Sequence, residues 1–139
     1  MPIDFLTMNK KAIAEFRANG GKVGGQFAGA PLLLLHTTGA KTGQARVNPM
    51  MYLADGDDHV VFASKAGAPT NPDWYHNLVA NPRASIEVGD QTLNVVARVA
   101  DGETRERLWS RQKELYPGFA DYEAKTTRQI PVVILETEA

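Results

Sequence analysis

Cysteine is absent from the 139 residues of this chain. Without thiols the protein has no disulfides, no thiolate zinc or iron–sulfur site and no cysteine nucleophile. Its three histidines, His36, His59 and His76, are scattered along the sequence and form no H-x-x-x-H pair. Two ligands on one helix face are therefore missing, and the sequence predicts no bound metal.

Long apolar runs and a strong net charge are missing as well. No stretch approaches the roughly 20 apolar residues that span a bilayer, and the first residues lack the pattern of a secretory signal, so we expect a cytoplasmic protein. The net charge of −1 gives no general attraction to nucleic acid, and any anion-binding site must be local. With 43% apolar residues, the chain is long enough for one domain with a core.

Residues 1–24 are predicted to form an amphipathic helical arm. Apolar side chains recur at helical spacing: Phe5, Met8, Ala12 and Phe16. The other face carries basic side chains: Lys10, Lys11 and Arg17. Such a helix can lie over the rest of the domain, or it can rest on an anionic membrane surface, which a basic face favours.

The remaining sequence predicts a small α+β barrel. Strands are expected at residues 32–37, 46–54, 59–64, 83–88, 92–100 and 131–135, which gives about six mostly antiparallel strands. Together with the arm, helices that begin near residues 72 and 101 give about three. Short connections, such as the Gly89-Asp90 hairpin, favour a barrel over a doubly wound sheet.

The stretch HTTGAKTGQARVNP, residues 36–49, places glycines and cations between two expected strands. It lacks the glycine pattern of a Walker phosphate loop, and it leads to a strand where that loop leads to a helix. A turn can still bind an anion through backbone N–H groups and cations, here Lys41, Arg46 and Lys65. Spacing alone leaves both an anion cradle and a solvated hairpin open.

Aromatic residues form a second group: Trp74, Tyr75, Tyr116, Phe119 and Tyr122. Aromatic side chains at such spacing are more often core than site, but tyrosines near a chain break keep a polar tip that binds water or a ligand. No G-x-S-x-G elbow and no obvious acid–base pair of carboxylates is present.

Four runs, TTGAKTGQARVNP, FASKAG, NPDWYHNLVANP and LYPGFADYEAKTTRQIPVVIL, resemble the deazaflavin-dependent nitroreductase and quinone reductase family. These actinobacterial reductases use coenzyme F-420, an 8-hydroxy-5-deazaflavin. The resemblance runs from about residue 24 to the C-terminus. It implies an α+β split β-barrel of the FMN-binding-like type, with residues 25–139 as the deazaflavin-binding domain.

The resemblance also implies roles for individual residues. Lys41 and Arg46 would hold the phosphate of the coenzyme with the help of Lys65, and the ring would lie against residues 50–52 and 64–77. The implied coenzyme contacts are Lys41, Thr42, Gly43, Arg46, Asn48, Pro49, Met50, Met51, Lys65, Trp74, Tyr75 and Asn77. The implied catalytic residues, which would hydrogen-bond the acceptor and stabilise its developing oxyanion, are Ser64, Tyr116 and Tyr122.

The implied reaction is hydride transfer from the reduced coenzyme to a quinone or another electron-poor acceptor. Met51 and Phe119 stand where the best-known member has tyrosines, so a quinone is the expected substrate and nitroreduction a side activity. Two alternatives stay open: a non-catalytic carrier of the deazaflavin or of a hydrophobic ligand, and an FMN-dependent split-barrel oxidoreductase. Relatives on this barrel often pair, which leaves a homodimer open.

Overall fold

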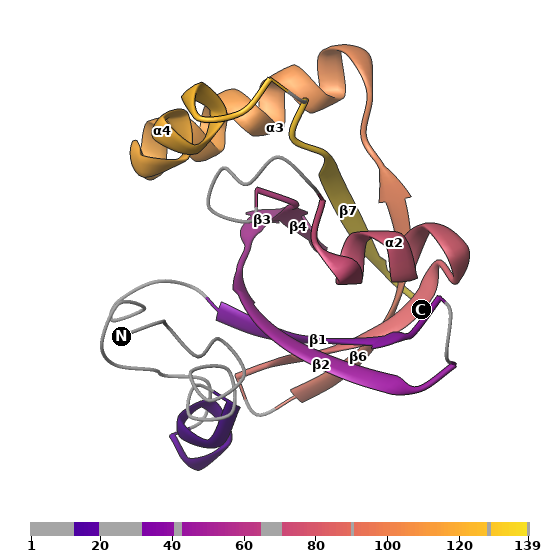
Figure 1. Cartoon of the computed structure of the whole chain (residues 1–139). Coiled ribbons are helices and arrows are strands. Elements are labelled where there is room, and N and C mark those ends of the chain that lie inside the picture. Colours follow the sequence, from indigo (N-terminus) through magenta and orange to yellow (C-terminus); the bar gives the residue numbers. More distant parts are fainter. Residues whose placement is uncertain are drawn as a thin grey trace, which may run out of the picture.

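The structure, a computed structural model, describes residues 13–19, 32–40, 43–64, 71–89, 91–127 and 129–138. Within these residues one antiparallel seven-stranded sheet curls into a half-barrel (Figure 1). The strands are β1 (Leu32–Thr38), β2 (Ala45–Met51), β3 (Leu53–Asp55), β4 (Asp58–Phe62), β5 (Arg83–Val88), β6 (Gln91–Val99) and β7 (Val132–Thr137). The helices are α2 (Asp73–Ala80), α3 (Gly102–Leu115) and α4 (Gly118–Ala124), and residues 13–18 form a further helical segment.

Strands β2 and β3 lie at opposite edges of the sheet, although only Tyr52 separates them in the sequence. The strand order is β2-β1-β5-β6-β7-β4-β3, so the chain sweeps across the open side of the half-barrel between the two edges (Figure 1). The single strand expected at residues 46–54 is therefore wrong. It is two strands, of which β2 pairs with β1 and β3 pairs with β4.

The hairpins expected from the sequence are confirmed. Strands β5 and β6 pair in register from Val88 opposite Gln91, and the turn begins at Gly89 with a φ of +60°. Glycine adopts this left-handed conformation at no steric cost, which fits the two-residue turn. The proline of β2, Pro49, is tolerated because β2 is an edge strand, where a missing ladder N–H breaks no central pairing.

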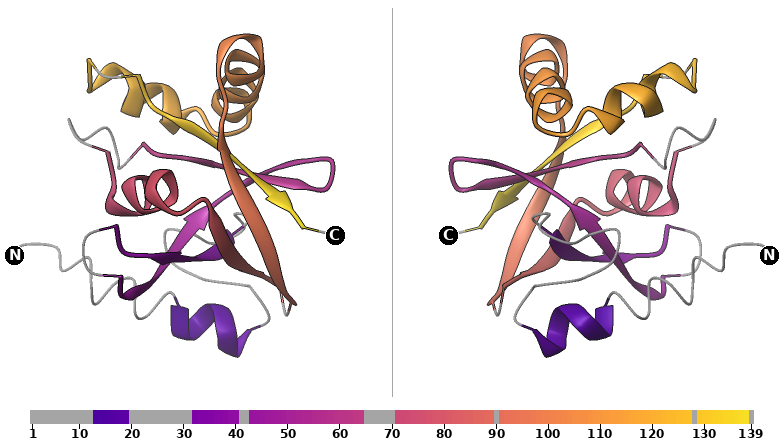
Figure 2. Two further views of the ribbon diagram at one scale, coloured as in Figure 1. Left: turned by 90° about the vertical axis from the view of Figure 1, so that its right-hand side faces the viewer. Right: turned by 90° about the vertical axis from the view of Figure 1, so that its left-hand side faces the viewer.

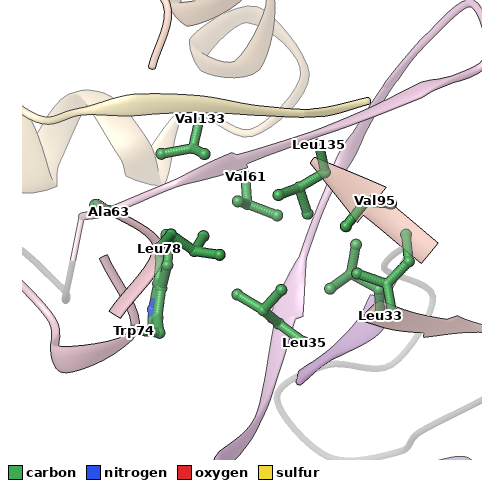
Figure 3. Packing of buried hydrophobic residues seen from close by; sticks show 10 residues of the cluster. Leu33, Leu35, Val61, Ala63, Trp74, Leu78, Val95, Val133 and Leu135 are labelled. Carbon is green, nitrogen blue, oxygen red and sulfur yellow. The ribbon is translucent and has the colours of Figure 1, made fainter. Parts of the chain in front are cut away.

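Helix α2 fills the concave side of the half-barrel. Its buried residues Trp74 and Leu78, one helical turn apart, point into the same space as Leu35 and Val61 (Figure 3). Cross-strand neighbours Val95 and Leu135 complete this main core. The helix therefore connects the β1–β2 side of the sheet to the β4–β7 side.

Two smaller cores lie outside this one, and helices cover both. Phe16 of the segment 13–18 is 1% exposed and packs on Leu32 and Leu34, which face away from α2. Helices α3 and α4 cover the other end, where Leu108 and Trp109 pack against Phe62. Figure 2 shows the segment 13–18 and the α3–α4 pair at opposite ends of the molecule.

The predicted division at residue 24 stays a prediction, because residues 20–31 lie outside the described part of the chain. The burial of Phe16 shows that the described piece of the arm lies on the domain. Membrane contact through this helix also stays a prediction: Lys10 and Lys11 are not described, and Arg17 pairs with Glu87. In the described residues no helix is long and apolar enough to cross a membrane.

Candidate functional site

The base of the turn between β1 and β2 is hydrogen-bonded to the side chain of Asn77, which belongs to α2. The side-chain carbonyl of Asn77 accepts a hydrogen bond from the backbone N–H of Ala40 at 2.9 Å. The side-chain N–H2 of Asn77 donates to the hydroxyl of Thr37 at 3.1 Å. Asn77 and Thr37 are both buried, so these bonds form away from water and fix the base of the turn.

Arg46 shares a face of the sheet with this buried amide. It lies opposite Thr37 in the β1–β2 pairing, and residues directly opposite each other point to the same side. Asn48, opposite Leu35, follows on that side. The side chain of Arg46 is exposed and, among the described residues, has no hydrogen-bond or ion-pair partner. A guanidinium that is unpaired within the described part of the chain therefore lies beside the base of the turn that Asn77 holds.

The turn itself requires glycine at one described position. Gly43 has a φ of +70°, and its N–H donates to the carbonyl of Gly39 at 2.9 Å. No atom lies within 4 Å of the place that a Cβ would occupy, so the requirement is conformational and not one of space. Lys41 and Lys65, predicted to hold the phosphate with Arg46, and Thr42, another predicted coenzyme contact, lie outside the described residues.

The two methionines at the end of β2 point to opposite faces of the sheet. Met50 packs against the main core around α2, whereas Met51 packs against the Phe16 cluster. Pro49 lies opposite Leu34, whose side chain belongs to that same cluster. The implied coenzyme contacts on β2 therefore divide between two faces, with Arg46, Asn48 and Met50 on the α2 side.

The two aromatic residues at the start of α2 differ in exposure. Trp74 is 9% exposed and belongs to the main core, which is the more common role for such a residue. Tyr75 is half-buried and lines a hollow of about 200 Å³ together with Val79, Pro82 and Val99. Contact of Trp74 or Tyr75 with a ligand stays a prediction.

The predicted acceptor-binding tyrosines lie at the α3–α4 end. Tyr122 contacts Phe119 edge to face, with ring centroids 5.3 Å apart, and Phe119 in turn contacts Phe62 and Trp109 at 6.0 and 6.2 Å. Tyr116 caps the C-terminus of α3 and is half-buried. Ser64 is buried just after β4, two residues beyond Phe62. Their catalytic roles stay predictions.

One contact at this end was not expected from the sequence. Glu123 of α4 accepts a hydrogen bond from the indole N–H of Trp109 at 2.5 Å and another from Lys113 at 3.1 Å. Burial alone would raise the pKa of Glu123, but these two bonds and the nearby cations lower it below its ordinary value. No motif or periodicity pointed to this carboxylate, because its partners lie on another helix.

Glu87 forms a second carboxylate cluster, on the face covered by the segment 13–18. Arg17 donates two hydrogen bonds to it, at 3.2 and 2.9 Å, and the imidazole of His36 lies 2.5 Å from one carboxylate oxygen. The hydrogen bond from Arg17 lowers the pKa of Glu87, burial opposes this effect, and the bond with His36 adds to it. The cluster ties the segment 13–18 to β1 and β5.

Two hollows of the described surface lie apart from most of the predicted coenzyme contacts. The larger, of about 400 Å³, lies between β3 and α3 and is lined by Asp55, Arg107 and Arg111. The smaller contains only Tyr75 of the predicted set. Within the described residues no group of three or more His, Asp or Glu side chains gathers as a metal site would require.

Comparison with known proteins matches nearly the whole chain to one family. A sequence model of the family described as F420H(2)-dependent quinone reductase matches residues 8–137. An F420H(2)-dependent quinone reductase of Mycobacterium tuberculosis is 43% identical over 126 residues, which cover 88% of this chain and 85% of the relative. The match therefore includes the β1–β2 turn as well as α4.

Solved structures agree with this sequence similarity. An F420-H2 dependent reductase, FDR-A, is 44% identical and superposes with a TM-score of 0.70, covering 76% of this chain and 94% of the other. A structure described as a domain-swapped dimer is 38% identical, with a TM-score of 0.72 and coverage of 98% and 100%. The split β-barrel expected from the sequence is thus confirmed.

Proposed function

The chain belongs to the F420H(2)-dependent quinone reductase family, and we propose that it is an oxidoreductase that passes a hydride from the reduced deazaflavin coenzyme to a quinone. The coenzyme, when bound, supplies the hydride. The protein then has three tasks: to bind the anionic tail of the coenzyme, to orient its ring, and to place the acceptor beside it.

The described residues fit a ligand that combines an anionic tail with an aromatic ring. The exposed guanidinium of Arg46 has no carboxylate partner among the described residues, so it is free to bind a phosphate. Asn77 holds the base of the turn in place, and the N–H groups of Gly39, Ala40 and Gly43 are used within this framework, so Arg46 is the anion-binding group that the described residues offer. Met50 and Asn48 continue from Arg46 along the same face of β2.

The acceptor is proposed to bind at the α3–α4 end, which contains the predicted tyrosines. Phe119, Tyr122 and Phe62 provide an apolar and aromatic wall. The hydroxyl groups of Tyr116 and Tyr122 can donate a hydrogen bond to an acceptor oxygen as negative charge develops on it. Phe119 has no hydroxyl, which makes the wall more apolar and favours a quinone over a polar nitroimidazole.

The observation that carries this proposal is the unpaired Arg46 beside a turn fixed by a buried amide. A guanidinium–phosphate contact contributes about 1.5–3 kcal/mol. Replacing Arg46 by alanine should therefore raise the Kd of the reduced coenzyme about tenfold to a hundredfold. The matched control is Arg83→Ala, because Arg83 is likewise exposed and lies near the same end of β1, but on the face of the sheet opposite to that of its core neighbours Ala84 and Ile86.

Equilibrium titration of the coenzyme, followed by deazaflavin absorbance, measures both variants. A raised Kd in Arg46→Ala with an unchanged Kd in Arg83→Ala supports the site. Equal Kd values in both variants and the wild type contradict it. Tight binding in the wild type without menadione reduction would instead indicate a carrier of the coenzyme, and binding of FMN in its place would indicate a flavin enzyme.

We further propose that the chain forms a homodimer through the apolar surface around Tyr75. Val79 and Val99 are 58% and 47% exposed there, and they line the smaller hollow. The relative described as a domain-swapped dimer supports pairing. Val79→Asp together with Val99→Asp should shift the sedimentation coefficient from dimer to monomer, and an unchanged coefficient excludes this surface.

A further inference from the structure

We infer that Glu123 is a positioning residue: by binding Trp109 and Lys113, it holds α4 in the place where Tyr122 and Phe119 form the acceptor wall. This inference rests on the proposed function, because it assigns to Glu123 the geometry of the proposed acceptor site. It concerns affinity for the acceptor and not binding of the coenzyme.

Helix α4 has little else to hold it. It spans only Gly118–Ala124, contains no buried residue and has no side-chain hydrogen bond at its N-cap, Pro117. A helix this short is not stable by itself and takes its position from tertiary contacts. Among the described residues, α4 contacts the rest of the protein through Phe119 and Tyr122, which pack against the core around Trp109, and through the two hydrogen bonds of Glu123.

The hydrogen bond between Glu123 and Trp109 can position α4 because Trp109 is held in the core. Trp109 is 1% exposed and packs in the core beneath α3 beside Phe62. A buried indole N–H needs a hydrogen-bond acceptor, and the carboxylate of Glu123 is the acceptor here. Lys113, one turn further along α3, binds the other carboxylate oxygen. The carboxylate is therefore fixed from two sides.

The position of Tyr122 depends on Glu123 because both residues belong to the short helix α4. Tyr122 precedes Glu123, and its ring contacts Phe119 one helical turn earlier. A change in the rotation or tilt of α4 therefore moves both aromatic side chains of the wall together. Because a misplacement of about 1 Å can weaken a binding site substantially, the link from Glu123 to Trp109 controls the fit of the acceptor.

The test compares Glu123→Ala, Glu123→Gln and the control Glu114→Ala in the full chain. Glu114 is an exposed carboxylate on α3 next to Lys113. The Gln variant keeps an oxygen that can accept from Trp109, so it should rescue most of the loss. Steady-state kinetics with menadione and a titration of the coenzyme are measured for each, with hydrogen exchange of residues 118–124 as a readout independent of activity.

The inference predicts that Glu123→Ala raises the KM for menadione about tenfold, which corresponds to the loss of one strong hydrogen bond. The coenzyme Kd should change less than about twofold, whereas kcat should also fall, because a displaced Tyr122 hydroxyl stabilises the developing charge less well. Exchange at residues 118–124 should become faster, while Glu123→Gln and Glu114→Ala stay close to the wild type. Should Glu123→Ala fail to fold, Lys113→Met, which removes the ammonium donor to Glu123 and keeps an unbranched side chain, must raise the KM in the same direction.

An unchanged KM in Glu123→Ala overturns the inference while leaving the proposed function intact. A parallel rise in KM and coenzyme Kd also overturns it, because that result indicates general disruption. If the wild type itself does not reduce menadione, the proposed function fails, and no variant is needed to show it. Unchanged exchange at residues 118–124 contradicts the role of Glu123 whatever the activity.

Discussion

The side-chain carbonyl of Asn77 lies 2.9 Å from the backbone N–H of Ala40, and this bond joins α2 to the β1–β2 turn. The same amide donates to Thr37, so both polar ends of the side chain are engaged. Resemblance implies that Asn77 contacts the coenzyme. The structure shows a different contribution, in which Asn77 holds the base of the turn that is predicted to contact the coenzyme.

Asn77→Ala should weaken coenzyme binding about tenfold, because the turn loses a buried hydrogen bond of about 1–1.5 kcal/mol and its fixed shape. Thr37→Val removes only the far partner and should weaken binding in the same direction by a smaller factor. The control is Asn81→Ala, since the side chain of Asn81 is exposed at the end of the same helix. If Thr37→Val leaves the Kd unchanged while Asn77→Ala raises it, Asn77 contacts the coenzyme directly.

Trp74 provides a test of core packing against ligand contact. Its ring is 9% exposed in the core between α2 and the sheet, so Trp74→Ala should lower the free energy of unfolding by about 3–5 kcal/mol. Trp74→Phe should lower it less and leave the coenzyme Kd within about twofold of the wild type. Urea unfolding and coenzyme titration give the two quantities, with exposed Leu115→Ala on α3 as the control. A large rise in Kd without a loss of stability would assign Trp74 to the coenzyme site.

We predict that the attachment of the segment 13–18 depends on pH, because it involves the charge of Glu87. Because its pKa is lowered in the folded protein, chiefly by Arg17, its contribution to stability is complete above the pKa of the unfolded chain and is lost as the pH falls through the folded pKa. Glu87→Gln should therefore lower the free energy of unfolding by about 1 kcal/mol or less at neutral pH, since Arg17 is half exposed.

The measurement is urea unfolding at neutral pH and again below the ordinary pKa of a carboxyl, about 4. The difference between the wild type and Glu87→Gln should shrink at the acidic pH. Glu136→Gln is the control, because the pair of Glu136 with Arg98 is exposed on both sides. A difference that is equal at both pH values would show that the charge of Glu87 does not stabilise the segment.

The hairpins and the barrel could be predicted because short-range signals encode them. Gly89 marks the β5–β6 turn, and Asp101 marks the start of α3, where the structure has its N-cap. The break at Tyr52 carries no such signal. Residues 46–54 are continuously extended, and only the long-range pairings show that β2 and β3 belong to opposite edges.

The candidate site was proposed by resemblance, because physical reasoning from the sequence left both an anion cradle and a solvated hairpin open. Alternation along β2 could have separated Met50 from Met51, but the face that each occupies depends on where α2 and the segment 13–18 pack. The expected pocket role of Met51 remains a prediction, and its contact with the Phe16 cluster places it on the face away from α2. Glu123 was missed because hydrogen bonds between different helices leave no periodic pattern in sequence.

The proposed reaction of this protein is the transfer of a hydride from the reduced deazaflavin coenzyme to a quinone. Stopped-flow absorbance of the reduced coenzyme bound to the wild type, mixed with menadione or with buffer, tests it most directly. We predict that menadione makes reoxidation of the reduced coenzyme fast, and that this reoxidation slows when the transferred hydrogen is replaced by deuterium. Reoxidation at the same slow rate with and without menadione, despite tight coenzyme binding, would contradict it.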